Sequence, residues 1–352
     1  MEGLGVSGFW SGRRVLLTGH TGFKGAWMAQ LLNQLGAKVF GLALPPEGDV
    51  SLFDQLDLEN RLDHAEVDIR DYDRVAQRVA EVEPDILFHL AAQSLVLRSY
   101  DAPRETWDTN VGGTTNVLEA ARATHKPMTV IVITTDKVYK NREWDQPYRE
   151  SDRLGGHDPY SASKAACEIL TQSWQASFGL EGSLRIASAR AGNVIGGGDW
   201  AENRIVPDIA RAFFKDVAVE VRNPGAVRPW QHVLEPISGY MKLAERLHAD
   251  LSHARAYNFG PAAEDFHSVR DLLNQFCDVW PGEWRDTSSG SARHEAGLLS
   301  VTSDLARRRL GWKPVWSFEQ AVSKTAEWYR AHAEGADVTA ITDAQIKEFL
   351  AA

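Results

Sequence analysis

The sequence predicts an α/β fold in which a doubly wound parallel sheet is followed by a smaller, irregular C-terminal region. Short apolar runs alternate with helical stretches through the first half of the chain, and this alternation ends near Arg190. Such alternation is typical of right-handed βαβ crossovers. The runs are apolar almost throughout, as strands buried on both faces are. In such a sheet a ligand binds beyond the carboxyl ends of the strands, where the crossovers change sides.

Six strands are expected in the first half, each at one of these apolar runs. The first strand is expected at residues 15–17, and a glycine-rich loop and a helix that ends near Leu35 follow it. The later strands are expected at residues 39–42, 65–68, 85–90, 130–134 and 184–187.

Beyond the sheet, long loops at residues 196–203 and 223–230 alternate with isolated helices and short strands. Ser317-x-x-Gln320 and Thr342-x-x-Gln345 have the capping-box pattern and predict two helix starts. We expect this region to close over the ligand edge of the sheet and to return at least one segment to it.

Composition narrows the class of protein. The chain has 352 residues, of which 43% are hydrophobic and 24% charged, as is usual for a folded globular protein. We find neither an apolar run of about 18 residues, which a membrane span needs, nor a secretory signal in the first twelve residues. Two cysteines, Cys167 and Cys277, form neither a disulfide framework nor a zinc site, and we expect both in the core. The net charge of −10 argues against a nucleic-acid partner. A cytoplasmic protein without a metal is expected.

A glycine-rich loop directly after the first strand predicts dinucleotide binding. Its glycines let the backbone turn tightly and approach a pyrophosphate, which then lies on a helix N-terminus. A tight turn without a ligand is the alternative interpretation. The second strand ends at residues 42–45 with neither an acidic residue for a ribose nor an arginine for a 2′-phosphate, so NAD is favoured over NADP only weakly. The loop residues expected to bind the cofactor are Gly19, Thr21, Gly22, Phe23, Lys24 and Gly25.

Two further strand ends have features of a cofactor site. Asp68 and Ile69 close the third strand, where the aspartate is suited to accept a hydrogen bond from an adenine amino group. A solvated turn with a helix cap at Asp71 explains the same residues equally well. The fourth strand ends in small residues, as a flat cofactor passing over it requires, although packing alone also explains them. The residues there are Ala91, Ala92 and Gln93.

The strongest chemical signal is Tyr160-x-x-x-Lys164. On a helix these two side chains share one face, and a nearby ammonium favours tyrosinate and lowers the pKa of the phenol toward use as a base. An exposed helix face is the alternative. Together with the glycine loop and with Thr134-Thr135-Asp136 at the end of the fifth strand, the pair predicts a hydride-transfer site.

These motifs resemble those of the extended short-chain dehydrogenase/reductase family, which has a Rossmann-type fold. Within it, Thr134 to Tyr139 is similar to the fifth-strand signature of the nucleotide-sugar 4,6-dehydratases. Lys137 stands where relatives acting on dTDP-glucose have a glutamate. That residue, the loop from Gly19, the segment 192–200 and the segment 228–233 are most similar to the members acting on CDP-glucose. The resemblance covers residues 10 to 330.

The resemblance implies tightly bound NAD and conversion of CDP-glucose to a 4-keto-6-deoxy sugar for surface polysaccharides such as lipopolysaccharide. It implies that Tyr160 is the base at the 4-hydroxyl, Thr135 binds the 4-oxygen, Asp136 is an acid and Lys137 is the base at carbon 5. The alternative for Lys137 is an ion pair with Asp136. Thr134, Lys164 and Asn110, at the start of a helix, join the cofactor site; Asn193, Arg204, Arg228 and His232 are candidates to bind substrate, and Trp200 and Trp230 to wall the site.

Residues 10–190 are thus expected to form a dinucleotide-binding domain, 191–335 mainly a substrate-binding region and 336–352 a helical tail without an assigned role. The resemblance also implies a homodimer, built on the helix that begins near Asn110 and the helix of Tyr160, with a dimer of dimers as a further option. A 4-epimerase of the same family and a non-catalytic NAD-binding regulator are the rival functions.

Overall fold

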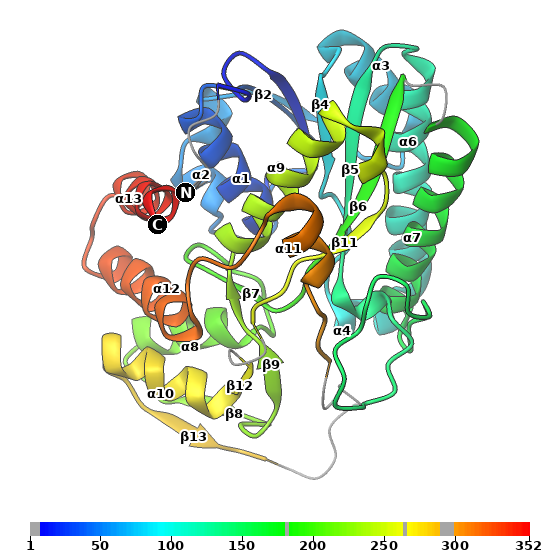
Figure 1. Ribbon diagram of the computed structural model, residues 1–352. Helices are drawn as coiled ribbons and strands as arrows, with labels where there is room; N and C mark the ends of the chain where they lie inside the picture. Colours follow the sequence, from blue (N-terminus) through cyan, green and yellow to red (C-terminus); the bar gives the residue numbers. More distant parts are fainter. Residues whose placement is uncertain (1–7, 180–182, 263–265, 289–298) are drawn as a thin grey trace.

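A seven-stranded parallel sheet forms the centre of the computed structural model, which describes residues 8–179, 183–262, 266–288 and 299–352 (Figure 1). Every neighbouring pair of its strands is parallel, which confirms the predicted fold class. In spatial order the strands are β11 (Ala256–Asn258), β6 (Leu184–Arg190), β5 (Met128–Thr134), β4 (Ile86–His89), β1 (Arg14–Thr18), β2 (Lys38–Ala43) and β3 (Asp63–Glu66).

Two strands differ from their predicted carboxyl ends by two residues or more. The third, β3, ends at Glu66 rather than at residue 68; Val67 still donates its N–H to the Ala43 carbonyl at 2.9 Å, and Val67 and Ile69 are buried in the core beside the sheet. The sixth, β6, extends three residues further, to Arg190, because its small buried residues pair in register with β5. The first helix, α1 (Phe23–Gln34), ends one residue before Leu35.

Helices cover both faces of the sheet, and alternate residues of each strand face opposite cores. Helices α3 (Tyr72–Val82), α6 (Gly113–Ala123) and α7 (Pro159–Phe178) lie on one face, where they pack with Leu16 and Val130. Helices α1 and α9 (Leu234–Ala249) lie on the other face, where they pack with Leu17 and Ile131. This period of two is what a strand buried on both faces requires.

The irregular region after β6 forms three two-stranded sheets and several helices below the central sheet in Figure 1. Strand β11 comes from this region and pairs with β6. The capping box predicted at Ser317 and Gln320 is confirmed at the start of α12. The elements are β7 (Val194–Ile195) with β10 (Gln231–His232), β8 (Val219–Val221) with β13 (Trp284–Asp286), β9 (Val227–Pro229) with β12 (Phe266–Ser268), α8 (Ile205–Phe214), α10 (Val269–Val279), α11 (Asp304–Leu310) and α12 (Phe318–Ala333).

The C-terminal tail forms a helix, α13 (Val338–Ala351), that packs against α12 and α1. The capping box predicted at Thr342 is wrong, because α13 begins one turn earlier, with Asp337 as its N-cap. Thr342 is instead buried, and its hydroxyl accepts a hydrogen bond of 3.0 Å from the Trp328 indole. Asp343 accepts one of 2.6 Å from Gln34 of α1. The tail is thus joined to both the sheet region and the C-terminal region.

Two other predictions about single residues need correction. Asn110 does not open a helix, because α5 (Pro103–Trp107) continues through a π-helical turn, Asp108–Gly112, directly into α6. Cys167 is buried as predicted, but Cys277 is only half-buried on α10.

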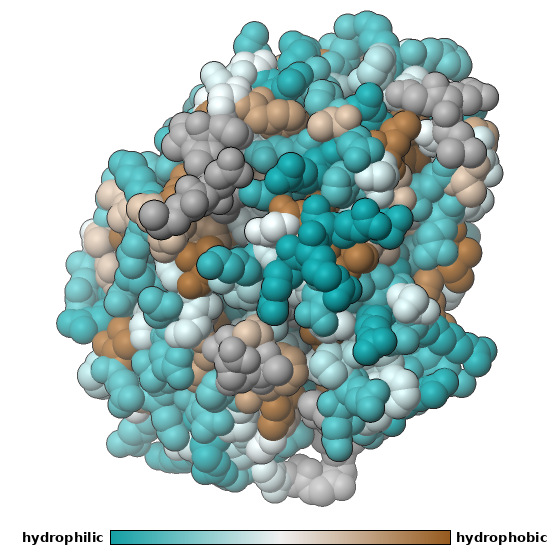
Figure 2. Space-filling model, in the orientation of Figure 1, coloured by the Kyte–Doolittle hydropathy of each residue, from teal (hydrophilic) through white to brown (hydrophobic). Residues whose placement is uncertain are grey.

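The face of the molecule seen in Figure 2 is mostly polar, and apolar side chains appear there only in small separate patches. Within the part of the chain that the structure describes, no helix is both long and apolar enough to cross a membrane.

Candidate active site

A cleft of about 2770 Å³ lies at the carboxyl ends of β1, β4 and β5. Strands β1 and β4 are neighbours whose crossovers run in opposite directions, so this is the switch point where a doubly wound sheet binds its ligand. The volume exceeds the roughly 300–1,000 Å³ of a site for one drug-sized ligand. It is large enough for a dinucleotide and a second ligand together.

Most of the residues predicted from the sequence meet in this cleft. The exceptions are Asn110 and His232, which do not line it. Those that line it are Gly19, Thr21, Gly22, Phe23, Lys24, Gly25, Asp68, Ile69, Ala91, Ala92, Gln93, Thr134, Thr135, Asp136, Lys137, Tyr160, Lys164, Asn193, Arg204 and Arg228, together with Trp200 and Trp230.

The glycine loop is packed closely onto the end of β4. Gly19 has φ of +72°, and a Cβ there would lie 2.7 Å from the Ala91 nitrogen. A Cβ on Gly25 would lie 2.2 Å from the Gly19 carbonyl oxygen. Gly22 differs, because its Cβ would meet only that oxygen, at an ordinary 3.5 Å. Gly22 is the N-cap of α1 without a capping side chain, so the first N–H groups of α1 face the cleft and fit a pyrophosphate.

These distances predict different consequences for two similar substitutions. Gly25→Ala is expected to destabilise the protein by more than about 1 kcal/mol, because its methyl group overlaps backbone. Gly22→Ala is expected to leave thermal unfolding nearly unchanged. It should weaken dinucleotide binding, because the added methyl group projects to where the pyrophosphate is expected to lie. Thermal melts and calorimetric titration with NAD⁺ measure the two effects. Equal dinucleotide affinity in Gly22→Ala and the parent would contradict the site.

At the third strand end, the helix cap at Asp71 is confirmed, whereas the contact of Asp68 with an adenine stays a prediction. Asp71 caps α3 by accepting a hydrogen bond from the Arg74 N–H, as the turn interpretation predicts. Asp68 lines the cleft, and hydrogen bonds from the Arg70 guanidinium hold the pKa of its carboxyl below the usual value. The carboxylate is therefore ionised and available as an acceptor at neutral pH.

Asn110 acts behind the cleft wall rather than on it. Its side-chain oxygen accepts a hydrogen bond of 2.8 Å from the Gln93 N–H, and its nitrogen donates to the Gln93 carbonyl at 3.0 Å and to the Ser163 hydroxyl at 2.9 Å. Asn110 is 1% exposed and does not line the cleft. The structure therefore does not support the predicted cofactor contact, and Asn110 positions the end of β4 instead.

Tyr160 and Lys164 share one face of α7, whose N-terminus is capped by Asp158. Lys164 Nζ donates a hydrogen bond of 2.8 Å to the Ile133 carbonyl at the end of β5. Burial raises the pKa of Tyr160 to about 12, and a side-chain hydrogen bond with Thr135 opposes that rise. Burial also lowers the pKa of Lys164. The sequence predicted a lowered pKa for Tyr160. In the protein without a ligand the pKa is raised instead, because the effect of burial is larger than that of the nearby groups that lower it.

Asp136 is a buried carboxyl beside this pair. A Cβ on Gly192 would lie 1.8 Å from its Oδ2, so only glycine leaves room for it. Its Oδ1 accepts a hydrogen bond of 3.0 Å from Thr135, and Oδ2 has no hydrogen-bond partner among the described residues. Burial raises the pKa of Asp136 although Lys137 and Arg228 lie near enough to oppose the rise. A carboxyl that keeps its proton longer than usual is suited to act as an acid.

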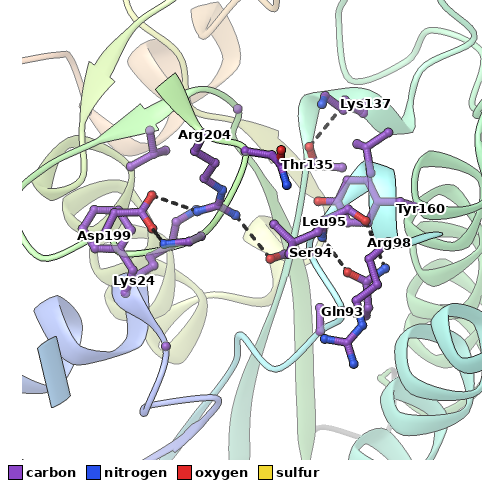
Figure 3. Close-up of a pocket in the computed structure, with 18 of the residues that line it drawn as sticks. Lys24, Gln93, Ser94, Leu95, Arg98, Thr135, Lys137, Tyr160, Asp199 and Arg204 are labelled. Carbon is purple, nitrogen blue, oxygen red and sulfur yellow. Dashed lines mark hydrogen bonds and ion pairs between the residues drawn. The ribbon is translucent and has the colours of Figure 1, made fainter. Parts of the chain in front are cut away.

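Lys137 is half-buried beside Tyr160 and Thr135 (Figure 3). Of the ion pairs formed between described residues, none joins Lys137 to Asp136, because Asp136 Oδ1 is bonded to Thr135 and Oδ2 is unpartnered. The geometry therefore does not support the alternative in which Lys137 only neutralises Asp136.

The opposite wall carries Arg204, which precedes α8. It forms an ion pair of 3.0 Å with Asp199 and donates to the Ser94 hydroxyl at 3.3 Å, which bridges the two sides of the cleft (Figure 3). Arg228 on β9 donates to the Val227 carbonyl at 2.9 Å. Sequence analysis did not identify Asp199 or Ser94, since neither stands in a motif that pairs it with an arginine.

The loop that carries Asp199 is held from the C-terminal helices. A Cβ on Gly197 would lie 2.0 Å from the Trp328 ring of α12. The Gly197 carbonyl accepts a hydrogen bond from Trp27 at 2.9 Å, and the Asp199 carbonyl accepts one from the Tyr329 hydroxyl at 2.5 Å. The position of Arg204 therefore depends on α12.

His232 does not bind in the cleft. Its ring is fully buried and lies edge-on to Trp27 and Trp316, and its Nδ1 accepts a hydrogen bond from the Leu234 N–H. Burial lowers its pKa to about 3, so the ring is neutral. The prediction that His232 binds substrate is wrong, because its side chain points into the core, where it packs against Trp27 and Trp316.

Solved structures share this fold. UDP-glucose-4-epimerase from Stenotrophomonas maltophila superposes with a TM-score of 0.80 over 92% of this chain and 100% of that chain, at 23% identity. dTDP-glucose 4,6-dehydratase from Bacillus anthracis superposes with a TM-score of 0.76 over 92% and 99%, at 18% identity. The chain thus shares its fold with this epimerase and this dehydratase.

Sequence comparison is more specific. A family model described as GDP-mannose 4,6 dehydratase matches residues 16–325. CDP-glucose 4,6-dehydratase from Salmonella typhimurium is 40% identical over 351 residues, which are 98% of this chain and 98% of that protein. dTDP-glucose 4,6-dehydratase from Shigella flexneri is 29% identical over 91% of this chain and 93% of that one. The chain belongs to the GDP-mannose 4,6-dehydratase family, whose members are nucleotide-sugar 4,6-dehydratases.

Proposed function

We propose that the protein is a CDP-glucose 4,6-dehydratase, a hydro-lyase that converts CDP-glucose to CDP-4-keto-6-deoxyglucose and water. The observation that carries the proposal is the 40% identity, across 98% of both chains, to the CDP-glucose enzyme. The relatives that act on dTDP-glucose stand at 24% to 29% identity.

NAD is the proposed cofactor, bound with its pyrophosphate at Gly22 and its nicotinamide near Tyr160. The bare N-terminus of α1 and the small residues after β4 support this placement, as do the NAD-containing structures of the epimerase from Stenotrophomonas maltophila and the dehydratase from Bacillus anthracis. When bound, NAD would supply the hydride chemistry, as acceptor at carbon 4 of the sugar and donor at carbon 6, so the whole reaction would be redox-neutral.

The residues of the cleft supply the proton transfers. Tyr160 takes the proton of the 4-hydroxyl, and Thr135 binds the same oxygen. The Thr135 hydrogen bond and the charge of Arg204 both favour the phenolate against its burial. The 4-ketone makes the carbon 5 proton acidic, and Lys137 removes it. Asp136, whose pKa burial raises, then protonates the departing 6-hydroxyl so that water leaves.

Arg228 and Arg204 are proposed to hold the diphosphate, because a guanidinium matches phosphate oxygens in a bidentate manner. Asn193, which also lines the cleft, is proposed to bind the sugar.

Arg228→Ala is expected to raise the KM for the nucleotide sugar at least tenfold while kcat changes little, as loss of uniform binding does. Arg228→Lys keeps the charge but cannot form the bidentate contact of a guanidinium, so its KM is expected to lie between those of the parent and Arg228→Ala. Steady-state kinetics measure both, and an unchanged KM in Arg228→Ala would remove Arg228 from the site.

One assay separates this proposal from its rivals. Each of CDP-, dTDP-, UDP- and GDP-glucose is incubated with the protein, and the 4-keto product is read from its absorbance in alkali. Only CDP-glucose should give strong product. A 4-epimerase would give the C4 epimer without a keto product, and a non-catalytic NAD-binding regulator would give neither.

We further propose a cytoplasmic homodimer that acts in the synthesis of deoxysugars for surface polysaccharides such as lipopolysaccharide. The two free cysteines accord with a reducing compartment. Exposed Trp107 on α5 and Ile169 on α7 support an interface on these helices; a dimer of dimers remains part of the proposal. The boundaries 10–190, 191–335 and 336–352 are kept as the proposed division of the chain.

A further inference from the structure

Lys24 stands where elementary electrostatics disfavours a cation. It is the second residue of α1, whose N-terminus already carries the positive end of the helix dipole, and the first turn has no acidic residue. Local rules broken in this way are expected at functional sites. Lys24 also lines the cleft, and Figure 3 places it on the wall of Asp199 and Arg204.

The lysine side chain is enclosed by charged and polar groups from four elements. Its Nζ lies 3.2 Å from the Tyr240 hydroxyl of α9 and 5.5 Å from the centre of that ring. The charges of Arg204 before α8, Lys164 on α7 and Asp136 after β5 also act on it. Burial, then the charges of Arg204 and Lys164, lower the pKa of Lys24 to about 8, and Asp136 opposes the shift.

Tyr240 provides a partner for either protonation state of this lysine. It is fully buried, and burial raises the pKa of its phenol, so it stays un-ionised. Its oxygen accepts a hydrogen bond from an ammonium, and its O–H is able to donate to a neutral amine. Neither state leaves a buried polar group unsatisfied, so the cost of switching between them is low.

We propose that Lys24 is the charge-compensating group of the cofactor site: it releases a proton to solvent when oxidised NAD binds and takes one up from solvent when the nicotinamide is reduced. The inference rests on NAD as the proposed cofactor. Lys24 Nζ contacts Tyr240, whose phenol interacts with Tyr160 and Asp136, and Lys164 is hydrogen-bonded at the end of β5. Both amines thus lie near the place proposed for the positive nicotinamide. An ammonium at Lys24 opposes the oxidised ring and favours the neutral, reduced one, against the attraction of the pyrophosphate proposed at Gly22. Hydride transfer is thereby biased toward oxidation of the sugar.

The first test needs no substrate and no turnover. Calorimetric titration of the wild-type protein with NAD⁺ at pH 8, in two buffers of different ionisation enthalpy, should show proton release. The NAD⁺ affinity should rise by up to about tenfold between pH 7 and pH 9, because binding selects the neutral amine. NADH affinity should not rise over this range. Binding of NAD⁺ without proton release would overturn this inference alone; no NAD⁺ binding at any pH would overturn the proposed cofactor as well.

Two substitutions at residue 24 keep its side chain either always neutral or always charged. Lys24→Met is never charged and should bind NAD⁺ at every pH as the wild type does at pH 9. Lys24→Arg is always charged and should bind it as the wild type does at pH 7. Proton release should vanish in both. If it persists in Lys24→Met, Lys164 is the titrating group and the inference is wrong.

Tyr240→Phe is the matched control. It keeps the amine but removes the acceptor of the ammonium, so proton release should remain with its midpoint at lower pH. A midpoint equal to that of the wild type would show that the Lys24–Tyr240 contact has no part in the switch and would overturn the mechanism argued from it.

Discussion

Tyr160→Phe is expected to fold, to bind NAD and nucleotide sugar, and to lose the first oxidation. The phenyl ring keeps the packing of a side chain that is 9% exposed, and only the proton acceptor is removed. The loss should exceed about 2 kcal/mol of transition-state stabilisation, or a rate at least about thirtyfold lower. Single-turnover absorbance of the reduced nicotinamide measures it.

Tyr257→Phe is the control for this prediction. Tyr257 is also fully buried, but its hydroxyl contacts His253 and it does not line the cleft. This variant should lose some stability and keep the rate of oxidation. Turnover of Tyr160→Phe near the parent rate would show that another group accepts the proton of the 4-hydroxyl.

Lys137→Ala is expected to oxidise carbon 4 and then stop. Without a base for the carbon 5 proton, the protein should accumulate the reduced nicotinamide and a 4-keto-glucose, and exchange of the carbon 5 hydrogen with deuterated water should vanish. Stopped-flow absorbance and mass spectrometry of the recovered sugar measure these two results. Rapid deuterium incorporation at carbon 5 in this variant would show that another group removes the proton.

Asp136→Asn is the matched comparison, because it changes the neighbouring residue without changing Lys137. The amide fits the space beside Gly192 but cannot donate an acidic proton. Carbon 5 should still exchange, while loss of the 6-hydroxyl fails. If both variants stop at the same step, the separate roles of base and acid are wrong.

The fold was predictable because its signals are local. Each apolar run, such as residues 15–17 or 130–134, predicts one strand, and the glycine loop predicts the turn into the first helix. Parallel pairing follows because the strands alternate with helices. The proposed catalytic residues could be predicted to lie together, because Tyr160 and Lys164 are spaced by one helical turn and Thr135 to Lys137 are adjacent in sequence.

The errors arose where distant packing decides the outcome. His232 has the residue type of a ligand, but Trp27 and Trp316 enclose it in the core. The Asn110 side chain is hydrogen-bonded to the backbone of Gln93 and is therefore not available to a ligand. The Lys24–Tyr240 contact joins residues 216 positions apart and leaves no trace in either local sequence.

The dependence of the Asp199 loop on α12 has a consequence for how the protein is made. A chain leaves the ribosome N-terminus first and its domains fold as they emerge. The proposed cradle for the dinucleotide is complete once α7 has appeared, whereas Trp328 and Tyr329, which hold the loop before Arg204, come near the end of translation. A nascent or prematurely terminated chain should therefore sequester cofactor without recognising sugar. Ribosome-stalled chains of graded length would reveal the order in which the two capacities arise.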